Sequence, residues 1–159
     1  MKVKTKYIVL ISVIAVVIAI DLITKVLFGD ISYTEIIPKL INFETNHGND
    51  GAAWGIFGGK KGLLIAIGLL GFIVFLLIDI FVLKSRSKIY TIGLGMYLGG
   101  TIGNLIDRIF LGYVRDFINF TFLPNFPTFN FADSFLCVGA VLLCVYLVFY
   151  FSKEKDGKD

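Results

Sequence analysis

The sequence predicts an all-α membrane protein in which four transmembrane helices form a single domain over residues 1–159. Of its residues, 57% are hydrophobic and only 17% are charged, whereas soluble domains hold about 25% charged residues. A helix needs about 20 apolar residues to cross roughly 30 Å of hydrocarbon. Four stretches meet that length, with approximate bounds 7–28, 62–83, 89–109 and 135–151.

The distribution of lysine and arginine predicts how these helices are oriented. Basic clusters precede the first stretch, separate the second from the third, and follow the fourth, so four crossings place all three on one side. The positive-inside rule makes that side cytoplasmic, and both termini with it. The first stretch is expected to remain an uncleaved span, because it is long and lacks a small-x-small cleavage site. The clusters are Lys2, Lys4 and Lys6; Lys84, Arg86 and Lys88; and Lys153, Lys155 and Lys158.

The two longer connections, about residues 29–61 and 110–132, then face outward. In the first, segments of β-forming residues around an Asn/Gly-rich turn predict a small sheet near the lipid headgroups. The second is rich in phenylalanine, which favours an interfacial segment over disorder. The predicted strand segments are 31–37, 40–45 and 52–57, and the turn is 46–51.

The third stretch is the least apolar and carries glycines at four-residue spacing, namely Gly95, Gly99 and Gly103. A helical face without side chains predicts close packing against another helix. A neighbouring stripe of Gly100, Asn104 and Arg108 makes the outer end of this helix polar.

The sequence gives little support for a metal site or for a serine nucleophile. The chain has one histidine, His47, and no Cys/His cluster, so we expect neither a metal nor another cofactor. Ser134 lies beside Asp133, but no histidine stands in a suitable partner position. No nucleic-acid partner is expected. Acidic residues remain as the source of acid/base groups.

Three acidic residues have a structural explanation. Asp21 lies one turn before Lys25, and an i,i+4 ion pair neutralises both charges. Asp107 adjoins Arg108 at the polar outer end of the third helix, where we expect a buried network that anchors the outer loop. Asp79 lies near the cytoplasmic basic cluster and is expected to pair or snorkel there.

Asp116 and Asp133 flank the second outer loop, and each has an alternative explanation. Asn130 and Asp133 form a cap-like Asn-x-x-Asp, so Asp133 is a candidate helix cap. Asp116 is a candidate ion-pair partner of Arg115 or Arg108. Taken together, two close carboxylates cannot both ionise easily, so one keeps a proton while the other activates water. The pair is therefore a candidate acid/base dyad.

The motifs around these aspartates resemble those of bacterial lipoprotein signal peptidase, also called signal peptidase II, over nearly the whole chain. The matching segments are Asp21-Leu-Ile-Thr-Lys25, Asn49-Asp-Gly-Ala-Ala-Trp54, Gly99-Gly-Thr-Ile-Gly-Asn-Leu-Ile-Asp-Arg108, Val114-Arg-Asp-Phe117 and Phe129-Asn-Phe-Ala-Asp133. The resemblance implies four transmembrane helices, a small extracytoplasmic β-cradle from the first outer loop, and a short interfacial helix in the second.

The same resemblance implies a metal-independent membrane aspartyl endopeptidase with Asp116 and Asp133 as its catalytic pair. Its substrates are diacylglyceryl prolipoproteins, which it cuts before the lipidated lipobox cysteine. We therefore expect contact with membrane lipids, inhibition by globomycin-type compounds, and a monomer in the bacterial plasma membrane with an extracytoplasmic active site.

The resemblance also assigns supporting positions. Those expected to line or support the substrate site are Asn49, Gly51, Gly100, Asn104, Arg108, Asn130 and Ala132, and the expected structural polar residues are Asp21, Lys25 and Asp107. Arg115 and the short Phe-rich connection from 116 to 133 depart from the family pattern. The alternative function is a small oligomeric proton-coupled transporter or channel with a relay of intramembrane aspartates, which leaves the outer polar motifs unexplained.

Overall fold

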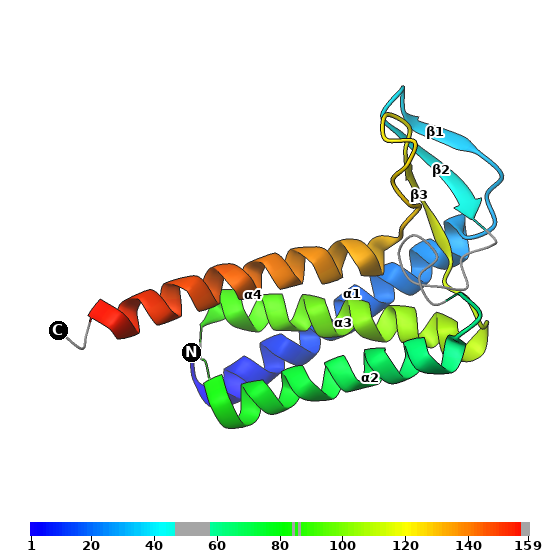
Figure 1. The fold of residues 1–159 in the computed structure, drawn as a ribbon. Helices are drawn as coiled ribbons and strands as arrows, with labels where there is room; N and C mark the ends of the chain where they lie inside the picture. The colour runs from blue at the N-terminus through cyan, green and yellow to red at the C-terminus, as the bar shows by residue number, and fades with distance from the viewer. Residues whose placement is uncertain (47–57, 84, 86, 157–159) are drawn as a thin grey trace.

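The computed structural model describes residues 1–46, 58–83, 85 and 87–156. Within these residues, the main elements are four long helices and a three-stranded sheet (Figure 1). All four helices are long and apolar enough to cross a membrane, which confirms the predicted fold class. They are α1 (Val3–Phe28), α2 (Lys61–Leu77), α3 (Lys88–Phe110) and α4 (Phe131–Asp156), with a π-helical turn, η2 (Ile78–Leu83), continuing α2.

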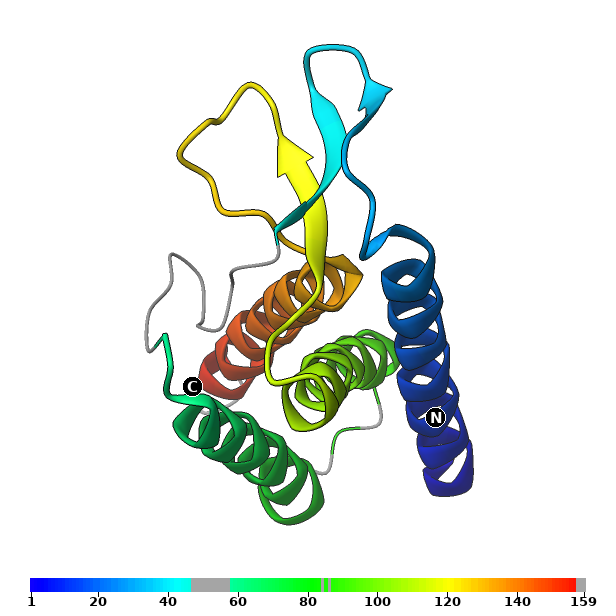
Figure 2. The ribbon, with the colours of Figure 1, turned by 90° about the vertical axis from the view of Figure 1, so that its right-hand side faces the viewer.

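The helix α3 occupies the centre of the bundle and packs against each of the other three helices (Figure 2). In its most apolar 18-residue window, 67% of the residues are buried, against 11–17% in the other helices. A helix that faces lipid must be apolar, whereas a helix enclosed by protein tolerates polar groups. This central position explains why the third stretch is the least apolar in the sequence.

Glycines let α3 approach its neighbours closely. A Cβ on Gly95 or on Gly99 would lie 2.8 Å from a valine of α1, and a Cβ on Gly93 would lie 2.9 Å from the Cβ of Leu142 on α4. Carbon atoms in favourable contact lie about 3.5–4.0 Å apart, so a larger residue requires a helix or a side chain to move. The close packing predicted from the glycine spacing is confirmed.

The sheet has antiparallel neighbours in the order β1-β2-β3. The first outer loop supplies β1 (Thr34–Ile37) and β2 (Ile41–Asn46), as predicted, but the third strand, β3 (Asp116–Phe120), comes from the second outer loop. The predicted strand at 52–57 and the predicted turn from residue 47 onward lie outside the described residues. Figure 1 shows the sheet at the end of the bundle opposite to the start of α1 and the end of α4.

Aromatic side chains hold the sheet against the bundle. The ring of Phe28, the last residue of α1, lies 4.9 Å from the ring of Phe43 on β2 and 5.7 Å from that of Phe117 on β3. Phe117 is fully buried, and its ring lies 6.2 Å from that of Phe131 at the start of α4. Because Phe117 directly follows Asp116, this cluster fixes Asp116 relative to both helices.

The second outer loop forms no helix in residues 111–130, all of which the structure describes. Its β3 segment pairs with β2 instead, and Phe129 forms an isolated bridge with Ile118. Aromatic and β-branched residues favour an extended strand here, and Pro124 and Pro127 remove backbone donors that a helix needs. The short interfacial helix implied by the family resemblance is therefore not formed in this segment.

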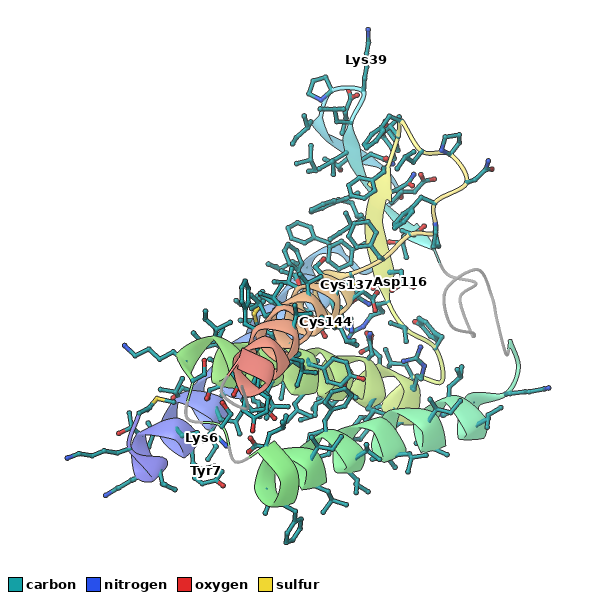
Figure 3. All side chains as sticks on the ribbon, turned by 60° about the vertical axis from the view of Figure 1, so that its left-hand side comes forward. Lys6, Tyr7, Lys39, Asp116, Cys137 and Cys144 are labelled. Atoms are coloured by element: carbon teal, nitrogen blue, oxygen red, sulfur yellow. The ribbon has the colours of Figure 1, made fainter. Side chains whose placement is uncertain are left out.

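A buried ion pair joins α1 to η2 at the other end of the bundle. Lys6 Nζ lies 2.6 Å from Asp79 Oδ1, and both side chains are buried. Lys6 Nζ also lies 5.8 Å from the centre of the Tyr90 ring. Figure 3 shows Lys6 at this end, away from Asp116. Pairing of Asp79 was predicted, but its partner comes from α1 and not from the neighbouring basic cluster.

Candidate active site

The start of α4 is a reciprocal capping arrangement between Asn130 and Asp133. The Asp133 amide donates to Asn130 Oδ1 at 2.9 Å, and the Asn130 amide donates to Asp133 Oδ2 at 3.2 Å. With α4 starting at Phe131, Asn130 is the N-cap and Asp133 the third helical residue, which is the spacing of a capping box. The prediction that Asp133 helps to cap α4 is confirmed. Of its two carboxylate oxygens, only Oδ2 takes part in the capping.

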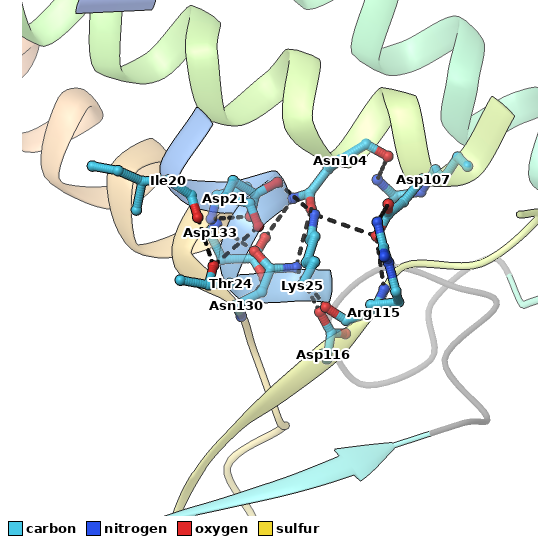
Figure 4. Close-up of polar contacts among 12 residues, drawn as sticks. Ile20, Asp21, Thr24, Lys25, Asn104, Asp107, Arg115, Asp116, Asn130 and Asp133 are labelled. Atoms are coloured by element: carbon cyan, nitrogen blue, oxygen red, sulfur yellow. Dashed lines mark hydrogen bonds and ion pairs between the residues drawn. The ribbon is translucent and has the colours of Figure 1, made fainter. Parts of the chain in front are cut away.

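Asp116 is the first residue of β3 and is only 3% exposed. Its Oδ1 accepts a hydrogen bond from Asn130 Nδ2 at 2.7 Å. The side chain of Asn130 therefore contacts Asp116 through its nitrogen and the Asp133 amide through its oxygen (Figure 4). One buried amide group thus holds the two aspartates near each other, although they come from different elements.

Asn104 connects the aspartates to α3. Its Nδ2 donates to Asp133 Oδ1 at 2.7 Å, while its Oδ1 accepts from Asn130 Nδ2 at 3.1 Å and from Lys25 Nζ at 3.0 Å. A lysine ammonium has no acceptor, so the Asn104 oxygen must face Lys25 and its nitrogen must face Asp133. The orientation of Asn104 is therefore fixed by its neighbours.

Four buried or partly buried charges form a neutral cluster beside these amides. Lys25 Nζ lies 2.8 Å from Asp21 Oδ2 and 3.4 Å from Asp107 Oδ2. Arg115 donates to Asp107 Oδ1 from Nη2 at 2.7 Å and to Asp107 Oδ2 from its backbone amide at 3.0 Å. The hydrogen bonds from the guanidinium to the Asp107 carboxylate raise the pKa of Arg115 above its ordinary value. Two carboxylates and two cations sum to zero charge, which limits the cost of burial.

This cluster forms the predicted buried network that anchors the second outer loop. The pair between Asp21 and Lys25 forms as predicted. Asp107 anchors the second outer loop through Arg115, because its carboxylate accepts hydrogen bonds from the Arg115 backbone amide and guanidinium. Arg115 therefore forms an ion pair with Asp107. Asp116 accepts a hydrogen bond from Asn130.

Ala132 lies where α4 packs against α1 and α3. Its backbone amide donates to Asp21 Oδ1 at 2.9 Å, and the residue is fully buried. A Cβ on Gly100 would overlap the Ala132 carbonyl oxygen, and a Cβ on Gly103 would lie 3.3 Å from the Ala132 Cβ. The structure therefore places Ala132 and Gly100 in the packing that supports the site.

Arg108 lies at the mouth of a cavity beside the aspartates. Its Nη1 donates to the Asn104 carbonyl at 3.4 Å, and the negative charges of Asp133 and Asp116 act on its guanidinium. Arg108, Asn104 and Asp133 line the outer part of the cavity, which has a volume of about 280 Å³ and is walled elsewhere by mainly apolar residues of α2, α3 and α4. The cavity leads from Asp133 into the apolar part of the bundle.

Most of the residues predicted from sequence meet in this region, while Asn49 and Gly51 lie outside the described residues. Sequence reasoning missed the contribution of α2 to the cavity, for which Gly68 and Gly71 in an otherwise bulky helix were the available signal. In the described part of the chain, no three His, Cys, Asp or Glu side chains gather closely enough to hold a metal ion. The residues brought together are Asp21, Lys25, Gly100, Asn104, Asp107, Arg108, Asp116, Asn130, Ala132 and Asp133.

Comparison with known proteins agrees with this geometry. The family model for signal peptidase (SPase) II matches residues 13–149. A bacterial membrane enzyme solved by the in meso method at 2.3 Å resolution is 30% identical, with a TM-score of 0.81 over 95% of this chain and 92% of its own. A second such structure, at 1.9 Å, is also 30% identical, with a TM-score of 0.77 over 91% of this chain and 93% of its own. The chain belongs to the signal peptidase II family.

Proposed function

We propose that the protein is a membrane aspartyl endopeptidase that removes the signal peptide from diacylglyceryl-modified prolipoproteins, cutting directly before the lipidated cysteine. Membership of the signal peptidase II family makes it a protease of aspartic type that processes lipoprotein signal peptides. The lipid modification and the position of the cut belong to the proposal. Asp116 and Asp133 are its catalytic pair, and no cofactor takes part.

The single observation that carries the proposal is the contact of one Asn130 side chain with both aspartates. Its nitrogen lies 2.7 Å from Asp116 Oδ1, and its oxygen lies 2.9 Å from the Asp133 amide nitrogen. Aspartyl proteases work through two carboxylates that are close enough to share a proton. Asn130 is fully buried, so water does not compete for these bonds.

The single positive charge of Arg108 balances the charge of Asp116 and Asp133 when the two carboxylates share one proton. Its guanidinium is under the influence of both carboxylates. Two ionised carboxylates beside one cation would leave a net negative charge near hydrocarbon, which is costly. With one shared proton, the group of Arg108, Asp116 and Asp133 is neutral.

In the proposed reaction, the ionised carboxylate takes a proton from water, and the water oxygen bonds to the scissile carbonyl carbon. The protonated carboxylate gives its proton to the carbonyl oxygen, which forms a neutral tetrahedral diol. The bond from carbon to nitrogen then breaks as the nitrogen takes the proton held by the first carboxylate. The second carboxylate recovers a proton from the diol, so the pair returns to its starting state.

The location of the pair fits a substrate that is held in the membrane by acyl chains. Such an anchor keeps the scissile bond near the bilayer surface, so catalytic groups belong at helix ends. Asp116 and Asp133 lie at the sheet end of the bundle, whereas the basic cluster that includes Lys6 lies at the other end. The positive-inside rule then gives an extracytoplasmic active site in a bacterial plasma membrane protein.

The test is cleavage of a purified diacylglyceryl prolipoprotein by the wild type, Asp116→Asn and Asp133→Asn in detergent micelles. Asparagine at position 116 keeps the acceptor for Asn130 Nδ2, and asparagine at position 133 keeps one of the two acceptor oxygens and the backbone bond to Asn130 Oδ1, so both variants are expected to fold. We expect each to lose about 10²–10⁴-fold in kcat, the range for a general acid or base. Asp30→Asn, an exposed acidic residue just after α1, is the matched control and should cleave at the wild-type rate.

A folded Asp116→Asn or Asp133→Asn enzyme that cleaves at the wild-type rate would sink the assignment. The transporter alternative predicts instead a proton flux in liposomes that Asp21→Asn abolishes. The pairing of Asp21 with Lys25, and of Asp107 with Arg115, places both aspartates in fixed ion pairs rather than in a relay. No observation favours the transporter over the protease.

A further inference from the structure

The cavity beside Asp133 extends far below the polar site. At its outer end lie Asp133 and Arg108, and at its inner end lie Gly71 of α2 and Tyr97 of α3. Arg108 and Tyr97 are eleven residues apart on α3, which corresponds to about 16 Å at 1.5 Å per residue. The hydrocarbon of a bilayer is roughly 30 Å thick, so a slot of this depth spans about one leaflet.

One side of this slot lies between α2 and α4. Among the described residues, α2 packs closely against α3 but makes no close backbone contact with α4. Both α2 and α4 nevertheless contribute residues to the cavity wall. An apolar chain lying in the bilayer can therefore reach the slot sideways, between α2 and α4.

Below Asn104, the side chains that line the slot are apolar except for those of Thr101 and Tyr97. The hydroxyl of Thr101 is already used, because it donates to the Tyr97 carbonyl at 2.8 Å. An extended peptide placed there would leave its backbone N–H and C=O groups without partners, at a cost of several kcal/mol each in hydrocarbon. An acyl chain carries no such groups. A single side chain is too short to fill a slot of this depth.

We infer that this slot holds one acyl chain of the substrate's diacylglyceryl group and that Tyr97 sets the longest chain that fits. The inference rests on the proposed function, since it names the part of the lipidated substrate that lies beside the catalytic pair. Lipid hydrocarbon is as apolar as the slot, so the slot contributes alignment and a length limit rather than hydrophobic attraction. Tyr97 is then a specificity-determining residue.

The inner end of the slot can be changed without disturbing the catalytic groups. A Cβ on Gly71 would lie 3.7 Å from the Tyr97 hydroxyl oxygen, an ordinary contact distance. Gly71→Ala therefore fits with little strain, and Gly71→Leu fills the lower part of the slot. The Tyr97 ring packs on Phe75 at 4.4 Å between ring centres, and Tyr97→Leu removes that ring and deepens the slot.

The experiment measures kcat/KM for prolipoproteins that carry two identical saturated acyl chains, in a series from ten to eighteen carbons. We expect Gly71→Leu to lower kcat/KM about tenfold for the longest chains while sparing the shortest, with Gly71→Ala intermediate, as steric overpacking predicts. Tyr97→Leu should shift the preferred length upward. Gly62→Leu adds the same side chain at an open position of α2 and should leave the length profile unchanged.

Equal loss at every chain length in Gly71→Leu, or a length profile unchanged in both Gly71→Leu and Tyr97→Leu, overturns the inference while leaving the protease assignment intact. Failure of the wild type to cleave any lipidated substrate would instead reject the proposed function. Gly71→Ala protects the test against misfolding, because its small methyl group needs no rearrangement and still shortens the slot.

Discussion

Replacing Asn130 with alanine removes the side chain that joins the two aspartates. Four hydrogen bonds are lost: the Asp133 amide to Asn130 Oδ1 at 2.9 Å, and Asn130 Nδ2 to Asp116 at 2.7 Å, to Asn104 at 3.1 Å and to the Arg115 carbonyl at 3.4 Å. The first caps α4, and the second is a charge-assisted bond when Asp116 is ionised. The substitution therefore acts on both stability and the geometry of the site.

The magnitude follows from these contacts. An N-cap side chain contributes about 1 kcal/mol, and a hydrogen bond to a charged group contributes about 1.5–3 kcal/mol. Because Asn130 is fully buried, Asn130→Ala should lower the free energy of unfolding by about 2.5–4 kcal/mol. Release of Asp116 from its position should lower kcat by about 10²-fold, the typical effect of a displacement of roughly 1 Å.

Asn130→Ser separates the two effects. Serine is a good N-cap, but its side chain is one atom shorter and lacks the amide donor that reaches Asp116. We expect it to be about 1 kcal/mol more stable than Asn130→Ala and to share its catalytic defect. The assays are denaturant unfolding in micelles and cleavage of a lipidated prolipoprotein. The reasoning is refuted if Asn130→Ala unfolds and cleaves like the wild type, or if Asn130→Ser retains full activity.

Three further substitutions test the scaffold. Lys25→Met leaves two buried carboxylates without their shared cation and should cost about 3–5 kcal/mol, visible as a lower unfolding midpoint; an unchanged midpoint contradicts the ion cluster. Gly100→Ala pushes on the Ala132 carbonyl and should cost about 1–3 kcal/mol together with cleavage activity; retention of both would show that α3 and α4 are not in tight contact. Asp79→Asn leaves the Lys6 charge buried and should cost about 3–5 kcal/mol without changing kcat per folded molecule; a catalytic defect in the folded fraction would contradict its distance from the site.

Local patterns predicted much of the architecture. The spans follow from length and hydropathy, and Asp21 with Lys25 follows from helical spacing. The Asn-x-x-Asp pattern predicted that Asn130 and Asp133 cap α4, and the capping box forms. Each of these features depends on residues that are close in sequence, so the chain segment itself carries the information.

Features that depend on tertiary packing were not predictable in the same way. The third strand pairs with β2, from which it is separated by at least 70 residues of sequence, and the strand propensity of its residues does not specify which strand it pairs with. The bond of Asp107 to Arg115 depends on the turn after α3, and the helical pattern of α3 does not specify the path of that turn. The cavity wall from α2 includes space that Gly71 leaves open, and a sequence shows such space only as a missing side chain.

Asn130 combines a feature that its local sequence predicts with one that only tertiary packing creates. Its backbone position as an N-cap is a local property, whereas its contact with Asp116 exists only because β3 returns to the start of α4. Sequence reasoning placed Asn130 among the supporting residues without identifying it as the link between the aspartates.

The central claim is that Asp116 and Asp133 act as one catalytic unit, and a double-mutant cycle on cleavage tests it most directly. Single-turnover rates would be measured for Asp116→Asn, Asp133→Asn and the double variant on the same lipidated prolipoprotein. Residues that act as a unit have strongly non-additive effects. We therefore predict that both single variants and the double variant share nearly the same residual rate. Rate losses that multiply in the double variant would contradict the account, because they would mean that the two aspartates act independently.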